Sequence, residues 1–359
     1  MFKFSRLIIG LKKLAQNILA KISSFFHKPW AKPRGGDLMI TSLCNFRCSH
    51  CNIWQEQKKP ELTLAEWQKI IIDLRQWLGS HYPLSVGGGE PFLRPDILDI
   101  LDFLVKHDFQ VTIETNGSLI DEQLAKKLVA LGISEIRISL YSFAPELHNK
   151  MRGIPEAHKK AMAALNFLAD AKKATNSKLK ICLGLLVNDE NIGSDALALI
   201  EWANKKNFHI LIQALDENFK NDYEQANWYE FNKLWPKKDE EIILFFAQVV
   251  ALKKQGIKID NTFKNLDAFK EYFLRPEESV GFACPIGYRT MNIDPQGQIF
   301  FCFKTGSLNK SLVENSAKKL WFSPELQAKR ELIKNCQKVC RIRCYYQDNL
   351  IDKFLNFLK

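Results

Sequence analysis

The stretch Cys44-Asn45-Phe46-Arg47-Cys48-Ser49-His50-Cys51 carries three cysteines with the spacing C-x3-C-x2-C. Three thiolates leave one iron of a 4Fe–4S cluster without a protein ligand, whereas four would saturate it. An open coordination position is where a metal centre carries out chemistry. The alternative is a structural zinc site, which usually needs a second ligand pair about 12–20 residues further on. The next cysteine is Cys182, so the triple favours a catalytic iron–sulfur cluster.

The composition indicates a globular metalloprotein. A chain of 359 residues suits one barrel of about 200–250 residues with an appendage. Hydrophobic residues make up 46% of the chain and include 25 phenylalanines, which is ample for a large core. The nine cysteines fall mainly into two groups, and we find no signal-peptide cleavage pattern. Reduced thiols that bind metal in a cytoplasmic protein are therefore expected.

The net charge of +11 is concentrated at the N-terminus. Residues 1–36 contain eight lysines and arginines and no acidic residue, which leaves 43 basic against 40 acidic residues elsewhere. The body therefore has no basic patch that predicts nucleic-acid binding. Apolar residues at helical spacing predict a basic amphipathic helix, followed by a linker at Pro33-Arg34-Gly35-Gly36. Such a helix can lie in a membrane interface at the cytoplasmic face, although packing on the barrel or on a partner protein is the alternative.

From residue 38 onward, short apolar runs alternate with helical patterns. We expect six strands over residues 38–41, 84–87, 109–114, 135–140, 178–187 and 208–213. Helices are expected after Thr63, where Glu66 completes a capping box, after Asp121, and over residues 157–171. Repeated strand–helix units predict parallel strands with right-handed crossovers. The predicted fold class is α/β, a partial (β/α)6 parallel barrel with its chemistry at the C-terminal strand ends.

Further motifs follow the predicted strands in a definite order. Gly87-Gly88-Gly89-Glu90-Pro91 follows the second strand, Thr115-Asn116-Gly117 the third, and Ser139-Leu140 closes the fourth, with Met151-Arg152-Gly153 beyond it. Together with the cysteine triple, this ordered set resembles the radical S-adenosylmethionine (radical SAM) superfamily over about residues 37–215. Many relatives that carry a cysteine-rich C-terminal extension read Ser-Leu-Asp where this chain reads Ser139-Leu140-Tyr141, which weakens any transfer of substrate identity.

The resemblance implies a mechanism and a set of roles. A 4Fe–4S cluster on Cys44, Cys48 and Cys51 would bind S-adenosyl-L-methionine and cleave it reductively to a 5′-deoxyadenosyl radical, which abstracts hydrogen from a substrate. The implied cofactor-binding residues are Gly88 and Gly89 for close backbone approach to the methionine moiety, Glu90 for its ammonium, Arg152 for its carboxylate, Ser139 for the ribose, and Thr115 with Asn116 for the nucleoside. His50 would shield the cluster.

A second cysteine group lies near the C-terminus. Cys284 and Cys302 have the spacing C-x12-G-x4-C, and Pro295-Gln296-Gly297 predicts a hairpin turn between residues 290–293 and 298–301. Cys336, Cys340 and Cys344 follow with C-x3-C-x3-C spacing. The group resembles a shortened SPASM, or twitch, domain, and the resemblance implies one auxiliary 4Fe–4S cluster held by four of these five cysteines. A zinc site is the alternative. Cys182 is expected to be a buried core thiol.

The expected organisation has five parts. These are an N-terminal helix and linker (1–36), a radical SAM partial barrel (37–215), a helical connector (216–283), a small cysteine-rich iron–sulfur domain (284–344) and a helical tail (345–359). The favoured function is a radical SAM enzyme acting on a small-molecule, lipid or saccharide substrate, with a flavodoxin or ferredoxin as electron donor. A peptide-modifying maturase is the first alternative. The second is a non-enzymatic iron–sulfur or zinc protein that transfers electrons or binds partners.

Overall fold

The computed structural model describes residues 18–20, 22–217, 227–279 and 284–340. The first part of the predicted N-terminal helix, Cys344 and the expected tail over 345–359 lie outside the described residues. In the described part of the chain, no helix is both long and apolar enough to cross a bilayer.

Six parallel strands form the centre of the molecule, as predicted. Their order in the sheet is β6-β5-β4-β3-β2-β1, so each strand pairs with its neighbour in sequence. The bounds are β1 (Gly36–Thr41), β2 (Pro83–Gly88), β3 (Gln110–Thr115), β4 (Glu135–Ser139), β5 (Lys180–Val187) and β6 (His209–Ala214). Sequential parallel order distinguishes a barrel-type sheet from a doubly wound one. The predicted partial (β/α)6 barrel is confirmed.

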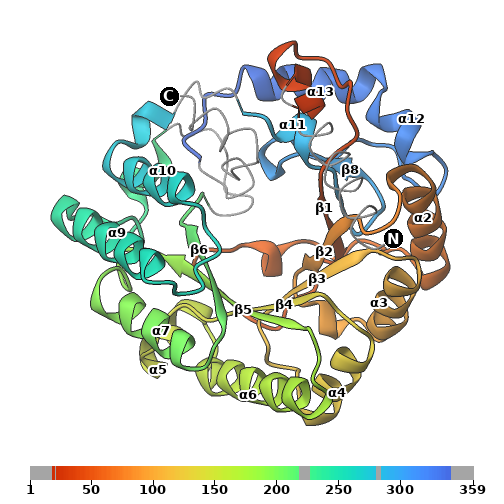
Figure 1. The fold of residues 1–359 in the computed structure, drawn as a ribbon. Helices are drawn as coiled ribbons and strands as arrows, with labels where there is room; N and C mark the ends of the chain where they lie inside the picture. The colour runs from red at the N-terminus through yellow and green to blue at the C-terminus, as the bar shows by residue number, and fades with distance from the viewer. Residues whose placement is uncertain (1–17, 21, 218–226, 280–283, 341–359) are drawn as a thin grey trace, which may run out of the picture.

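Helices form an arc around this sheet (Figure 1). Those of the barrel are α2 (Leu64–Leu78), α3 (Ile97–Lys106), α4 (Glu122–Ala130), α5 (Pro145–Arg152), α6 (Ala157–Thr175) and α7 (Ser194–Lys205). The capping box predicted at Thr63 is present, since its side chain accepts from the Glu66 amide while Glu66 accepts from the Thr63 amide. Asp121 caps α4 by accepting from the Leu124 amide at 2.7 Å. Both predicted helix starts are therefore confirmed.

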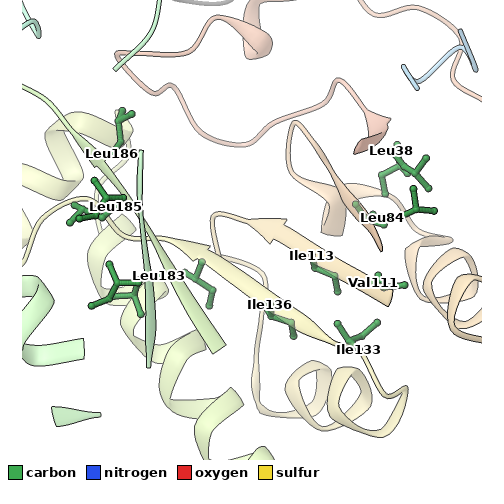
Figure 2. Packing of buried hydrophobic residues seen from close by; sticks show 14 of the residues in the cluster. Leu38, Leu84, Val111, Ile113, Ile133, Ile136, Leu183, Leu185 and Leu186 are labelled. Carbon is green, nitrogen blue, oxygen red and sulfur yellow. The ribbon is translucent and has the colours of Figure 1, made fainter. Parts of the chain in front are cut away.

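The strands and helices enclose one large apolar core. Figure 2 shows side chains of β1 to β5 and of the preceding loops packed in it, among them Leu38, Val111, Ile136 and Leu183. In the β5 strand every residue after Lys180 is buried, the continuous apolar pattern of a parallel strand covered on both faces.

The connector after β6 is largely helical in its described part. It contains α8 (Trp228–Phe231), α9 (Asp239–Lys254) and α10 (Phe263–Leu274), followed by the 3₁₀ turn η3 (Pro276–Ser279). Helices α9 and α10 pack on each other. The boundaries of the connector expected over residues 216–283 stay a prediction, and residues 218–226 and 280–283 lie outside the described residues.

The C-terminal unit continues the barrel sheet instead of standing apart from it. The predicted hairpin forms as β7 (Asn292–Ile293) and β8 (Ile299–Phe300), which pair antiparallel. Strand β7 also pairs parallel with β1, through Leu38 and Ile293. Three helices follow or precede the hairpin, α11 (Ile286–Arg289), α12 (Ala317–Trp321) and α13 (Pro324–Lys334), and α12 packs on α2 (Figure 1). The second cysteine group is therefore attached to the same sheet as the first.

Candidate functional site

The cysteine loop leaves the C-terminal end of β1 and is fastened to the end of α5. The backbone amide of Arg47 donates to the carbonyl of Arg152 at 3.1 Å, and the amide of Ser49 donates to the carbonyl of Met151 at 3.0 Å. Phe46 is buried between Cys44 and Cys48 in the sequence, with 1% of its surface exposed. Helix α5 therefore fixes the middle of the loop that carries the three thiols.

Gly153 makes this attachment possible. It ends α5 in the left-handed conformation, with φ at +66°, which is strained for residues with a Cβ. A Cβ at this position would lie 2.2 Å from the carbonyl oxygen of Arg47. The Met151-Arg152-Gly153 motif thus brings the helix end and the cysteine loop into direct backbone contact.

Gly88 and Gly89 let the β2 end approach the start of the cysteine loop. A Cβ on Gly88, whose φ is +116°, would lie 2.3 Å from the Thr41 carbonyl oxygen, and one on Gly89 would lie 2.0 Å from that of Leu43. The amide of Gly89 donates to the Thr41 carbonyl at 2.9 Å. In this structure, residues 41–43 of the chain itself occupy the space that these glycines leave open.

Glu90 ties the second and third strand ends together. Its side chain has 0% exposure; one carboxylate oxygen accepts from the Thr115 hydroxyl at 2.7 Å and the other from the Asn116 amide at 2.8 Å. The first oxygen also accepts from the Phe92 amide at 3.3 Å. Burial raises the pKa of Glu90, against the lowering effect of these hydrogen bonds and of Arg152. Glu90, Thr115 and Asn116 are thus brought together as the motif order implied.

Two residues outside the predicted site hold the first residues of the cysteine loop. Glu61 accepts from the Thr41 hydroxyl at 2.9 Å and from the Ser42 amide at 2.8 Å. Arg94, 8% exposed, donates to the carbonyl of Ile40 at 2.9 Å and lies 3.8 Å from Glu61. Arg94 lies three residues beyond the glycine-rich motif, and nothing in the sequence marks either Arg94 or Glu61 as a contact of the cysteine loop.

Arg152 lies among the three cysteines. Its guanidinium stacks on the rings of Phe46, at 5.1 Å, and Tyr141, at 4.7 Å, and its Nε has no hydrogen-bond partner although it is buried. Burial alone would lower the pKa of Arg152, but Tyr141 and the thiols of the cysteine loop raise it. A buried cation with an unpartnered donor fits a site that receives an anionic group.

Tyr141 occupies the position where many relatives carry aspartate, and it faces His50. The Tyr141 hydroxyl lies 3.3 Å from Nε2 of His50, and Arg152, Cys48 and Ser139 also border the phenol. Burial lowers the pKa of His50 to about 3, and the charge of Arg152 contributes to this. His50 is therefore a buried side chain that favours its neutral form, and its shielding role stays a prediction.

The fourth strand end is braced from the other side by His148 and Asn191. Nδ1 of His148 accepts from the Tyr141 amide at 3.1 Å, and the side chain of Asn191 donates to the Tyr141 carbonyl at 2.6 Å. Burial lowers the pKa of His148 to about 2. The backbone of Tyr141 is thereby held on both sides.

Two thiols of the cysteine loop hold their protons more tightly than usual. Burial raises the pKa of Cys44, and it raises that of Cys51 to about 11. Cys48 adds to the rise of the pKa in both cases, and Cys44 adds to that of Cys51. Since metal ligands must be thiolates, binding of a cluster would release these protons.

The number of thiols on the loop is the feature that fits a cluster. Three thiolates leave one iron of a 4Fe–4S cluster without a protein ligand, whereas a structural zinc site takes four protein ligands. A separate group of His, Cys, Asp and Glu side chains whose ligand atoms lie within 4.8 Å of one another is formed, in the described part of the chain, by Glu135, Cys182 and Asp260. The three-thiol donor set of the cysteine loop fits a 4Fe–4S cluster with one open iron.

The Glu135–Cys182–Asp260 group lies at the N-terminal end of the barrel strands and already holds a cation. The Lys180 ammonium lies 3.0 Å from Glu135 and 2.7 Å from Asp260, and Arg137 lies 2.6 Å from Glu135. Cys182 is fully buried, as expected, but its surroundings are charged and not apolar. We assign this group to an ion-pair network at the N-terminal end of the barrel strands.

Part of the second cysteine group converges at the opposite end of the barrel. Cys302 is buried, and its sulfur accepts from the Lys304 amide at 3.4 Å. Burial raises the pKa of Cys302 to about 11, with Cys336 among the charges that raise it further. The Cys340 sulfur lies 3.5 Å from a carboxylate oxygen of Asp216. Cys284 is half-buried and Cys344 lies outside the described residues.

A buried lysine links these cysteines to the end of β6. The Lys304 ammonium lies 3.3 Å from Asp216 and 3.4 Å from Glu217, and its side chain is 7% exposed. Although burial would lower the pKa of Lys304, Asp216, Cys340 and Glu217 raise it. This ion-paired cluster could not be predicted from the sequence, because two acidic residues after β6 and one lysine after Cys302 form no recognisable motif.

The comparison with known sequences agrees with this geometry. The sequence pattern of the radical SAM superfamily matches residues 38–221, which is just over half of the chain. The chain belongs to the radical SAM superfamily. The matched region runs from β1 through β6 and includes every strand end described above apart from those of the C-terminal hairpin.

Curated relatives match part of the chain. The AdoMet-dependent heme synthase of Methanosarcina barkeri is 32% identical over 134 residues, which are 37% of this chain and 38% of that protein. The mycofactocin maturase MftC of Mycobacterium ulcerans is 31% identical over 155 residues, which are 43% of this chain and 40% of that protein. The chain thus spans about two-fifths of the length of these relatives.

The fold is shared with a solved radical SAM structure over a longer stretch. SuiB of Streptococcus suis, bound to its precursor peptide SuiA, superposes with a TM-score of 0.67 at 13% sequence identity. The superposition covers 92% of this chain and 78% of SuiB. At this identity the likeness concerns the fold, and its coverage means that the common architecture extends past the barrel into the C-terminal unit.

Proposed function

We propose that this protein is a radical SAM enzyme whose catalytic cluster is held by Cys44, Cys48 and Cys51. When bound, the cluster supplies the electron that cleaves S-adenosyl-L-methionine, and the resulting 5′-deoxyadenosyl radical takes a hydrogen atom from the substrate. The observation that carries the proposal is the three-thiol loop, which lies at the C-terminal end of β1 in a barrel whose sequence matches this superfamily.

The neighbouring strand ends are proposed to hold S-adenosyl-L-methionine. Arg152 would receive its carboxylate, which is supported by the buried, unpartnered Nε. Glu90 accepts three hydrogen bonds of the roughly four that a carboxylate can take, so about one acceptor position is left for the ammonium. Ser139 is assigned to the ribose and the Thr115–Asn116 turn to the nucleoside, because both end adjacent strands.

The same turn has a role before any ligand arrives. Glu90 holds Thr115 and Asn116 through its two oxygens, so the second and third strand ends form one rigid unit. Gly88 and Gly89 pack this unit against residues 41–43. We propose that these contacts set the position of the cysteine loop relative to the cofactor-binding strand ends.

Anaerobic reconstitution tests this function directly. The chain is loaded with iron and sulfide, reduced with dithionite and given S-adenosyl-L-methionine, and 5′-deoxyadenosine is measured. We expect its formation in the unaltered chain and its loss when Cys44, Cys48 and Cys51 are replaced by alanine. Cys182→Ala serves as the matched control, because that thiol lies in the ion-pair network at the other barrel end. A non-enzymatic metal protein is indicated if the triple variant and the unaltered chain form equal amounts.

We further propose one auxiliary 4Fe–4S cluster in the C-terminal unit. Its ligands would be four of Cys284, Cys302, Cys336, Cys340 and Cys344. Support comes from the mutual proximity of Cys302 and Cys336 and of Cys340 and Lys304. About eight irons per chain are expected with both clusters and about four with the first alone. Replacement of Cys302 and Cys340 by alanine should remove about four irons without removing the rest.

The substrate class is proposed from chemistry and location. A small-molecule, lipid or saccharide substrate is favoured, with a flavodoxin or ferredoxin as electron donor and a cytoplasmic, peripheral location through residues 1–36. Peptide maturation is the second candidate, and the observation that favours it is the shared fold with SuiB, a structure bound to a precursor peptide. Neighbouring genes separate the two, since a short precursor peptide supports maturation and a glycosyltransferase supports an envelope substrate.

A further inference from the structure

The segment before β1 presents its apolar face away from the protein. Residues 18–20 and 22–25 are helical, and residues seven positions apart share one face of a helix. Ile18 and Phe25 are such a pair, and Leu19 and Phe26 continue it; all four side chains are exposed. A helix that packs on a soluble protein normally buries such a face.

The opposite face of this segment is small and buried. Ala20 and Ser23 are each 1% exposed. The Ser23 hydroxyl accepts from the amides of Trp30, at 3.0 Å, and Ala31, at 3.2 Å, which folds the following turn back onto the helix. Because the buried face consists of small residues, the helix lies close to the protein while its large side chains point outward.

The C-terminal unit holds the segment in this orientation. The indole of Trp321 donates to the Ala31 carbonyl at 2.9 Å, and the side chain of Gln327 donates to the His27 carbonyl at 2.9 Å. Trp321 is fully buried. These contacts involve backbone carbonyls on both sides of Trp30, so the outward direction of the helix is set by α12 and α13 and not by its own sequence.

Three aromatic rings form the centre of the exposed surface. Phe25 and Phe26 pack edge to face with centroids 5.1 Å apart, and Phe26 packs on Trp30 at 5.3 Å. Their exposed fractions are 77%, 57% and 49%. A contiguous aromatic patch of this kind on a soluble protein marks a binding surface. We call these three residues the aromatic patch.

The charge of the N-terminal sequence indicates what covers the patch. Residues 1–36 carry eight basic and no acidic residues, and among the described ones Lys28 lies within the patch sequence and is exposed. We propose that the aromatic patch inserts into the interface of an anionic lipid membrane and that basic residues of this N-terminal sequence, Lys28 among them, bind the lipid headgroups. Phenylalanine and tryptophan favour this interface, and each nearby lysine or arginine adds attraction to an anionic surface.

This proposal is independent of the cluster chemistry. The proposed contact is interfacial, with the aromatic rings at the level of the lipid headgroups. A membrane at this surface would touch the side of the molecule formed by α12 and α13, next to the proposed auxiliary site. An envelope or lipid substrate would then be within reach of a peripheral enzyme.

Vesicle cosedimentation of the full chain tests the proposal. The unaltered chain is compared on vesicles of phosphatidylcholine alone and of phosphatidylcholine mixed with phosphatidylglycerol, at low and high salt. We expect binding to the anionic vesicles, weakening as salt increases. The variant Phe25→Ser, Phe26→Ser, Trp30→Ser should bind these vesicles about tenfold less or weaker still. Its melting temperature should be unchanged, because the three side chains are exposed.

A matched control removes three other exposed apolar side chains. Phe231, Ile243 and Leu244 are 68%, 50% and 59% exposed on α8 and α9, and their replacement by serine should leave vesicle binding unchanged. Equal binding by the patch variant and the unaltered chain would overturn the proposal. An equal loss of vesicle binding in the control variant would also overturn it. A third contrary outcome is a change in oligomeric state that depends on the aromatic patch and occurs without vesicle binding, because it would assign the surface to a protein contact.

Discussion

Replacing Arg94 by methionine should destabilise the barrel and loosen the cysteine loop. The Arg94 guanidinium donates to the carbonyls of Ile40 and Leu62, each at 2.9 Å, and forms a bidentate pair with Asp96, with both distances at 2.8 Å. Methionine fills a similar volume but offers no donor. The substitution therefore tests what the buried charge contributes, separately from packing.

The magnitude follows from the groups left without a partner. Both contacts from Arg94 to the carbonyls of Ile40 and Leu62 are buried, and a buried acceptor without a partner costs about 1–3 kcal/mol. Two of them give about 2–6 kcal/mol before the loss of the Asp96 pair is counted. Since Ile40 precedes the loop by two residues, the loop start should also become less ordered, and iron uptake on reconstitution should fall.

Arg75→Met is the matched control for this substitution. Arg75 also pairs with an aspartate, Asp108, at 3.2 Å, but its side chain is 31% exposed and that of Asp108 is 57% exposed. Exposed ion pairs contribute about 0–1 kcal/mol. Urea unfolding followed by circular dichroism gives both free energies, and iron per chain after anaerobic reconstitution reports on the loop.

The pH dependence provides a second readout of the Arg94 contact. The hydrogen bond from Arg94 holds the pKa of Asp96 below its ordinary value. An acid whose pKa is lowered by folding contributes stability above its unfolded pKa, about 3.9, and that contribution disappears as the pH falls through the folded value. The difference between unaltered and Arg94→Met chains should thus shrink below about pH 4. If the two arginine variants lose equal stability, Arg94 does not brace the loop as argued.

Two further substitutions test the other contacts of the site. Gly153→Ala should prevent cluster uptake and lower the melting temperature, because its Cβ would lie 2.2 Å from the Arg47 carbonyl oxygen. Gly193→Ala is the control, since Gly193 has φ at +95° with open space around it and the substitution introduces backbone strain alone. Equal effects of the two substitutions would contradict a role for the contact between Gly153 and Arg47. Lys304→Met should remove the buried ammonium that pairs with Asp216 and Glu217 and destabilise the chain by about 3–5 kcal/mol, measured by urea unfolding. An effect below about 1 kcal/mol would refute a buried ion pair.

The fold was predictable because the barrel follows from local signals. Each of the six strands is a short apolar run, and each lies within two residues of its expected start and end. Parallel strands that alternate with amphipathic helices have few ways to pack. Thr63 and Asp121 marked helix starts since capping depends only on neighbouring residues. The cysteine triple was equally readable, because metal ligands of one loop are close in sequence.

Contacts between distant segments were beyond the reach of the sequence. Glu61 and Thr41 are 20 residues apart, and Glu90 and Thr115 are 25 residues apart; the position of each follows from the packing of a strand end and not from spacing. The prediction that Cys182 is a buried core thiol was correct in its burial but did not include the charged side chains around it. Its burial follows from an apolar strand, but the charges around it come from neighbouring strands and from Asp260, 78 residues further on.

The glycine-rich motif shows why a motif can be read correctly and its physical reason still be incomplete. A ligand-centred interpretation assigns Gly88 and Gly89 to a bound methionine moiety, but a Cβ at either position would first collide with the backbone of residues 41–43. Glu90 likewise directs both oxygens to the next strand end. These residues hold the cysteine loop in place whether or not a cofactor is bound. Their substitution should therefore reduce stability as well as cofactor binding, which separates them from residues that contact the ligand alone.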